Sequence, residues 1–168
     1  IGGMALLIAA DRIFPTAREA TPRRGRSGES EVVLAADPAA PVAALVWKSV
    51  ADRYAGMLSI FRVYSGTLRK DATLLNPRTG ARERVGKLLR LHGEQTEEVT
   101  EVLPGQIAAI PKLKDTHTGD TLCDKASPIV YAPVVYPEPA TTFAMEPRTR
   151  GDEDKISTAL ARLMEEDP

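Results

Sequence analysis

The sequence predicts an all-β domain, a closed β-barrel, with an N-terminal helix and linker before it and a partial α+β segment after it. Short segments between residues 42 and 126 alternate between polar and apolar residues or run apolar. Turns that contain Gly or Pro separate them at regular spacing. Helical periodicity occurs near the two ends. Many short strands joined by Gly turns favour a barrel over a layer of helices.

The first fifteen residues predict a helix that ends at Pro15. Its apolar residues fall at helical spacing: Leu6, Leu7, Ala10, Ile13 and Phe14. Because no local segment covers this apolar face, we expect a neighbouring element outside this sequence to cover it. Residues 16–41 are rich in Arg, Gly, Ser, Ala and Pro, so we expect a flexible linker there.

The barrel is expected over residues 42–126. Val42–Val50 and Gly56–Tyr64 are its first long strands, and Asn76–Gly80 is a hairpin loop in which Gly80 can take a positive φ. Tyr64, Ser65 and Gly66 form a corner between an apolar run and the polar step that follows it. We expect these three residues to hold that corner.

Prolines recur from residue 128 to residue 139, which indicates an extended connector over 127–140. The last segment, 141–168, is expected to open a second domain. Thr141–Met145 predicts a strand, and Asp152–Glu166 predicts an amphipathic helix with acidic residues in its first turn. Glu165 and Glu166 lie at the end of that helix, where the helix dipole disfavours negative charge.

Composition gives little support to any one partner. The 168 residues include 22 basic and 23 acidic ones, so a contact with nucleic acid has to come from a local basic face. Cys123 is the single cysteine, which fits a reducing compartment, and we expect the protein in the cytoplasm. The apolar stretch Met4–Ala10 is too short to span a bilayer, so no membrane contact is indicated.

Four motifs in order carry a family resemblance: Leu45–Lys48, Phe61–Gly66, Arg82–Gly86 and Leu113–Leu122. This series is similar to that of the second domain of elongation factor G. The segments Tyr136–Pro139, Glu146–Pro147, Asp152–Lys155 and Glu165–Pro168 resemble the opening of the third domain of that family. The acidic loop 93–98 departs from the family pattern, in which basic residues are common, and favours the divergent elongation factor G-like branch.

The resemblance implies a translation-factor-type barrel that binds the ribosome through small-subunit ribosomal RNA and relays the state of a GTPase domain. It implies that residues 1–15 are the remnant of the last helix of that GTPase domain. It also implies GTP and Mg²⁺ for a longer parent protein, whose GTPase domain and remaining domains would be partners of this chain. For the chain itself we expect no enzymatic activity and no cofactor. The acidic loop would meet phosphate less favourably than a basic one.

Four arginines are the candidates for contact with RNA phosphate: Arg62, Arg82, Arg84 and Arg90. Arg82 and Arg84 are two residues apart, so on a strand both side chains point to one face and can reach successive phosphates. The alternative is that these charges keep a strand edge soluble and prevent sheet pairing. The residues alone leave both interpretations open.

Other chemistry lacks a supporting pattern. Gly80–Lys87 has neither the glycine spacing nor the hydroxyl residue of a phosphate-binding loop. His117, Cys123 and His92 lack the paired spacing of a zinc site, so no metal is expected. A stand-alone interaction barrel without a GTPase partner is the rival interpretation. A dimer through the exposed terminal helices is a further alternative.

Overall fold

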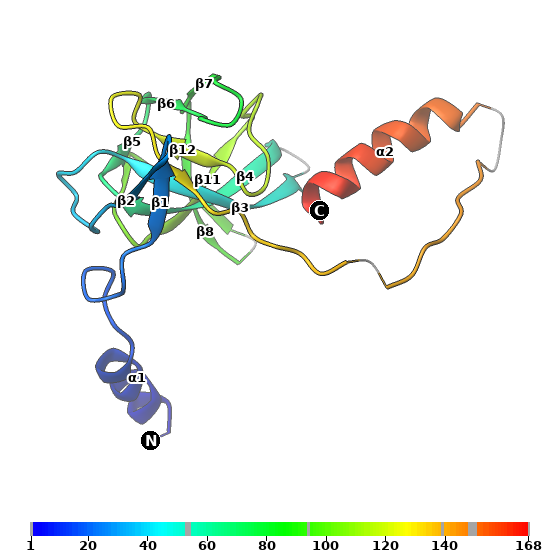
Figure 1. The fold of residues 1–168 in the computed structure, drawn as a ribbon. Coiled ribbons are helices and arrows are strands. Elements are labelled where there is room, and N and C mark those ends of the chain that lie inside the picture. Colours follow the sequence, from blue (N-terminus) through cyan, green and yellow to red (C-terminus); the bar gives the residue numbers. More distant parts are fainter. Residues whose placement is uncertain (1, 53–54, 94, 139, 148–150, 168) are drawn as a thin grey trace.

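The computed structural model describes residues 2–52, 55–93, 95–138, 140–147 and 151–167. Two helices flank a set of short strands (Figure 1). The helices are α1 (Gly2–Ile13) and α2 (Glu153–Glu166). The strands are β1 (Arg24–Ser27), β2 (Ser30–Val33), β3 (Ala43–Asp52), β4 (Gly56–Ser65), β5 (Leu68–Arg69), β6 (Thr73–Leu75), β7 (Arg82–Arg84), β8 (Leu88–His92), β9 (Gln95–Val99), β10 (Glu101–Val102), β11 (Ile107–Pro111), β12 (Thr121–Cys123) and β13 (Val130–Tyr131). We call β1–β13 the β-domain.

An eight-stranded antiparallel sheet has the order β7-β6-β12-β3-β4-β11-β8-β9. The predicted all-β fold, with a helix near each end, is confirmed. Closure differs from the expectation, because no continuous ladder joins the edge strands β7 and β9 within the described residues. β5 and β10 instead pair in a separate two-stranded sheet, and the backbone N–H of Lys70 donates to Thr100 O beside that pair.

The first part of β3, residues 43–46, is buried on both faces, and this explains its unbroken apolar sequence. Ala44 and Val46 point into the main core, which Phe61, Val63 and Leu122 also fill. Because side chains alternate along a strand, the residues between them point the other way, into a second cluster. The members of that cluster are Ala43, Leu45, Cys123, Ile129 and Tyr131.

A three-stranded sheet of order β13-β1-β2 covers the second cluster. This sheet lies where the sequence predicts a flexible linker and an extended connector. β1 reads Arg-Gly-Arg-Ser and carries no apolar side chain, so hydrophobic patterning could not reveal it. Gly25 is buried in β1, and a Cβ there would lie 2.6 Å from Ile129 Cγ1. Glycine at this position therefore allows β1 to pack closely against Ile129.

The C-terminal segment differs from its expectation in one element. Thr141–Met145 forms no strand, and Phe143 and Met145 are exposed. A strand needs a partner to satisfy its backbone groups, and nothing in the described part of the chain pairs with this segment. Residues 132–138 and 140–147 form no helix or strand, and the C-terminal end of α2 lies beside β3 (Figure 1).

The expected corner at Tyr64, Ser65 and Gly66 falls at the end of β4. Gly66 has φ 71°, and its N–H donates to Asp37 O at 3.0 Å. A Cβ on Gly66 would lie 2.6 Å from Ala40 O and from the backbone of Val42. Both the positive φ and the lack of space therefore require glycine at this position.

We expect Gly66→Ala to lower the free energy of unfolding by about 3 kcal/mol, because the added methyl meets backbone and the residue is strained. Urea denaturation measures the change. Gly86→Ala is the matched control, since a Cβ at Gly86 meets nothing within 4 Å, and its effect should stay within about 1 kcal/mol. Equal losses in the two variants would contradict the role of Gly66.

Candidate functional site

The arginines predicted for RNA contact lie on three different strands. Arg82 and Arg84 are on β7, Arg62 is on β4, and Arg90 is on β8. In the order of the sheet, β6, β12 and β3 separate β7 from β4, and β11 separates β4 from β8. The structure therefore brings Arg82 and Arg84 together and leaves Arg62 and Arg90 at other positions.

Arg82 and Arg84 are exposed on an edge strand, and Glu83 between them is buried. Arg84 Nη2 lies 3.4 Å from Asp71 Oδ1, and both side chains of this pair are largely exposed. Arg82 has no ion pair among the residues that the structure describes. The expected geometry, with both guanidinium groups on one face, is present, and RNA binding there stays a prediction.

Arg90 lies opposite acidic residues of β9. Arg90 Nη1 lies 3.9 Å from Glu97 Oε2. Glu98 on the same strand is 2.7 Å from Lys70 Nζ and 3.2 Å from Lys87 Nζ, and these hydrogen bonds lower the pKa of Glu98. Glu94 of the predicted acidic loop lies outside the described residues. The acids of β9 thus neutralise this part of the basic surface.

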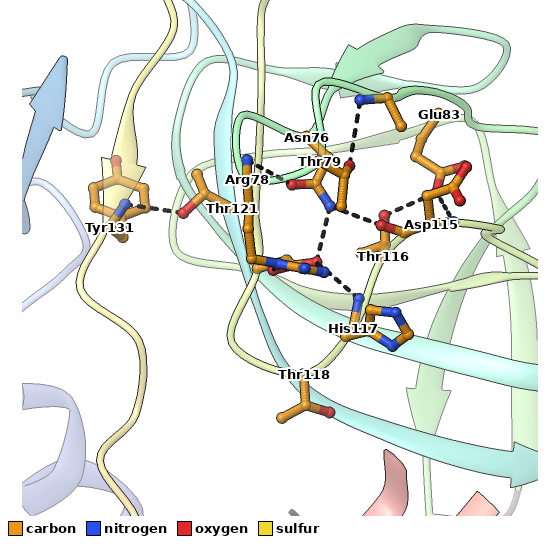
Figure 2. A network of polar contacts seen from close by, with 12 residues as sticks. Asn76, Arg78, Thr79, Glu83, Asp115, Thr116, His117, Thr118, Thr121 and Tyr131 are labelled. Carbon is orange, nitrogen blue, oxygen red and sulfur yellow. Dashed lines mark hydrogen bonds and ion pairs between the residues drawn. The ribbon is translucent and has the colours of Figure 1, made fainter. Parts of the chain in front are cut away.

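Sequence reasoning did not find a polar network around the loop between β11 and β12, which we call the 112–120 loop (Figure 2). Glu83, 4% exposed, reaches it from β7. Its carboxylate accepts from Lys114 N at 3.0 Å, Asp115 N at 2.7 Å and Thr116 Oγ1 at 2.9 Å. One buried acid thereby satisfies three donors of the loop.

Asp120 holds the other end of the loop. It accepts from His117 N at 2.9 Å, from Asn76 Nδ2 at 2.8 Å, and from Arg78 through Nε at 2.5 Å and Nη2 at 2.8 Å. Burial alone would raise the pKa of Asp120, but the hydrogen bonds from Arg78, His117 and Asn76 outweigh it and lower the pKa. Asp120 therefore stays ionised in the fold.

The end of α2 contacts this loop. Glu165 Oε2 lies 2.5 Å from His117 Nδ1, Thr118 N donates to Glu165 Oε1 at 3.3 Å, and Thr118 Oγ1 donates to the Glu165 carbonyl at 3.2 Å. Glu166 Oε1 accepts from Ala51 N of β3 at 2.5 Å. The two glutamates, unfavourable for the helix dipole, are thus acceptors for donors of the β-domain.

The surface beside the loop is hollowed. A cavity of about 380 Å³ lies there, and Arg78, His117, Gly119, Tyr131 and Pro133 are among its lining residues. Asp120 and Glu165 already pair with Arg78 and His117. In the described part of the chain, no group of three or more His, Cys, Asp or Glu could hold a metal ion. The observed arrangement is suited to holding the end of a helix.

These observations define a class of structure: an all-β domain whose 112–120 loop contacts the end of a following helix. Two family models match the chain: "Elongation factor G domain 2" matches residues 41–125, and "Elongation Factor G, domain III" matches residues 136–168. The chain belongs to the elongation factor G family.

A solved structure supports the same fold. The crystal structure of a protein from Thermus thermophilus matches 100% of this chain with a TM-score of 0.76 and 27% sequence identity. The chain spans 23% of the length of that protein. Among the described residues, neither helix has the length and apolar content needed to cross a membrane.

We expect Asp120→Asn to lower the free energy of unfolding by about 2 kcal/mol near neutral pH, because three residues that donate to Asp120 lose a charged acceptor. The folded-state pKa of Asp120 is lowered, so its contribution is present above the ordinary aspartate pKa and is lost as the pH falls through the folded-state pKa. The variant should therefore show a flatter acid limb in urea denaturation measured across pH.

Asp71→Asn is the matched control, because Asp71 also pairs with an arginine but is exposed. An exposed pair of this kind contributes about 0.5 kcal/mol or less. If Asp120→Asn and Asp71→Asn gave the same small change, the claim that Asp120 holds the loop would be wrong.

We expect Glu165→Gln to raise the amide exchange rate of α2 by about fivefold, because the neutral side chain is a weaker acceptor for His117 and Thr118. Exchange in β3 and β4 should not change. Asp167→Asn controls for the altered helix dipole, since Asp167 is an exposed acid at the same helix end. Equal acceleration in both variants would show that the contact with the loop does not hold α2.

Proposed function

We propose that this chain is the ribosome-binding β-domain, together with the start of the third domain, of an elongation factor G-like translational GTPase. The observation that carries the proposal is the pair of family matches, in consecutive order along the chain. In the longer parent, a GTPase domain would bind GTP and Mg²⁺. The β-domain would contact small-subunit ribosomal RNA, in the cytoplasm, and relay the nucleotide state.

β7 is the part of the β-domain best suited to meet RNA phosphate. The guanidinium groups of Arg82 and Arg84 project from one face of an edge strand. Asp71 is a weak competitor for Arg84, because exposed ion pairs at 3.4 Å gain little in water. Phosphate oxygens can therefore replace this contact, and release of counterions from the RNA would favour binding.

Arg62 and Arg90 are less suited to the same role. Glu97 lies near Arg90, and Lys70 and Lys87 are paired with Glu98 on the same strand as Glu97. An RNA backbone approaching β8 would meet the acids of β9 as well as the arginine. Arg62 stands over the ring of Tyr64, away from β7. We therefore propose β7 as the main RNA contact.

The contact between α2 and the 112–120 loop supports the proposed relay. Glu83 and Asp120 fix the loop, and the loop in turn offers donors to Glu165. A rotation of the β-domain would thereby also move α2, which belongs to the start of the next domain. Polar networks whose members are all paired are rigid, so the loop would move together with the β-domain.

A protein-interaction role without a GTPase partner is the alternative that the exposed helices favour. The apolar side chains Leu6, Leu7, Ile13 and Phe14 of the N-terminal segment are each about 70% exposed. Leu163 and Met164 of α2 are also exposed. Apolar faces of this kind need protein cover, from other domains of a parent, from another factor, or from a second copy of the chain.

We expect Arg82→Ala with Arg84→Ala, introduced into the full-length parent, to weaken binding to small ribosomal subunits. The slope of log affinity against log salt concentration should fall by roughly one or two units, because two phosphate contacts are lost. Binding measured across a salt series tests this. Folding should change by only about 0.5 kcal/mol per exposed substitution.

Arg24→Ala with Arg26→Ala is the matched control. These two arginines are also exposed, also two residues apart, and flank the buried Gly25 on β1. Their loss should leave the salt slope unchanged. If the β7 variant kept the wild-type slope while remaining folded, Arg82 and Arg84 would be solvated strand charges, and the RNA contact would lie elsewhere.

A further inference from the structure

A small hollow lies between the segment after α1 and strand β4. Its volume is about 150 Å³, room for about five water molecules. Arg23 and Arg62 both line it, together with Tyr64. The guanidinium carbons lie 5.4 Å and 5.7 Å from the centre of the Tyr64 ring, for Arg23 and Arg62 respectively. One tyrosine ring therefore holds two cations at the same hollow.

Neither cation has an acidic partner in the described part of the chain. Arg23 donates to Ala132 O at 2.9 Å and to the Tyr64 hydroxyl at 3.4 Å. The guanidinium group of Arg62 makes no hydrogen bond or ion pair among those residues. Within the same described residues, no carboxylate lines the hollow; the remaining lining residues are Ala17, Ala20, Thr21, Pro22, Leu34, Ala36, Val63 and Gly105.

Tyr131 does not supply the missing negative charge. Its ring lies 5.9 Å from the Arg23 guanidinium carbon, and it is 1% exposed. Burial raises the pKa of Tyr131 to about 12, so its hydroxyl stays neutral at physiological pH. That hydroxyl also has no hydrogen-bond partner among the described residues. Half-buried Arg23 and exposed Arg62 thus lie at one hollow that holds no acid among the described residues. A carboxylate from outside can pair with both guanidinium groups there.

The walls of the hollow favour a carboxylate on a protein over a phosphate of RNA. They are formed largely by small apolar residues, against which an acidic side chain on an apolar surface can pack. A nucleic acid base would need a free aromatic face, whereas guanidinium groups already lie over Tyr64. Four of the lining residues, between 17 and 22, follow α1 in sequence, and the exposed apolar face of α1 calls for protein cover.

We propose that Arg23 and Arg62 form a receptor for an Asp or Glu carboxylate on a protein surface that also covers the apolar face of α1. The guanidinium groups have free N–H donors for a charge-assisted, bidentate contact. Apolar burial along α1 would add affinity, and the carboxylate would fix the orientation of the partner. This contact is separate from the proposed RNA contact at β7 and does not depend on it.

The full 168-residue chain, labelled with ¹⁵N, tests the receptor by NMR titration with N-acetylglutamate amide and, separately, with a short oligouridine. We expect the glutamate probe to shift the Nε–H signals of Arg23 and Arg62 saturably in the millimolar range. Arg62→Ala should weaken this binding about tenfold, because a charged donor pair is lost. Arg62→Lys should weaken it less, since the charge remains.

Arg26→Ala is the control, because Arg26 is exposed on β1 and lies outside this hollow. It should bind the glutamate probe within about twofold of the unchanged chain. The guanidinium group of Arg62 makes no hydrogen bond in the described structure, so its removal should leave folding intact, and thermal unfolding checks this.

Two results would overturn the proposal. If oligouridine shifted the same arginine signals at lower concentration than the glutamate probe, the site would be an RNA contact. If neither probe moved them, or if Arg62→Ala and Arg26→Ala had equal effects, the two arginines would not form a receptor. Because β7 is unchanged in all these variants, the outcome leaves the proposed ribosome contact to its own test.

Discussion

The buried carboxylate of Asp120 is the constraint on which the 112–120 loop depends. The loop lies outside the ladders of the sheet, so its backbone N–H groups need other acceptors. Asp120 and Glu83 supply those acceptors from the two sides of the loop. The cost of burying Asp120 is offset by Arg78 and Asn76, which donate to it.

The position of the end of α2 depends on this fixed loop and on β3. β3 buries one face in the main core and the other under the β13-β1-β2 sheet, so it can shift little. The loop and β3 together present Thr118 N, His117 and Ala51 N to the end of α2. Polar contacts thereby hold the C-terminal end of α2, although the helix has an exposed apolar face.

Periodicity made the main elements predictable. The apolar spacing of α1 and α2 and the alternating strands indicated helices at both ends and an all-β middle, as the structure has them. The alternation around Glu83 also placed Arg82 and Arg84 on one face. The β13-β1-β2 sheet was missed because Arg24–Ser27 contains no apolar side chain and β13 has only two residues.

The polar network could not be predicted for a different reason. Asp120, Glu83 and Glu165 look like any other acids in a chain with nearly equal numbers of both charges, and most of their partners lie 31 or more residues away. The family motif Leu113–Leu122 marked the loop but not what holds it. One feature of the sequence could have indicated Glu83. Side chains alternate between the two faces of a strand, so Glu83 points inward when Arg82 and Arg84 point outward.

The central claim is that Asp120 fixes the loop, and that the fixed loop holds the end of α2. A double-mutant cycle with Asp120→Asn and Glu165→Gln, read out as the amide exchange of α2, tests this claim most directly. If the claim holds, the effects are strongly non-additive, because Glu165 has little left to contact once the loop is loosened. Additive effects would contradict it, since they would mean that α2 binds a loop that does not depend on Asp120.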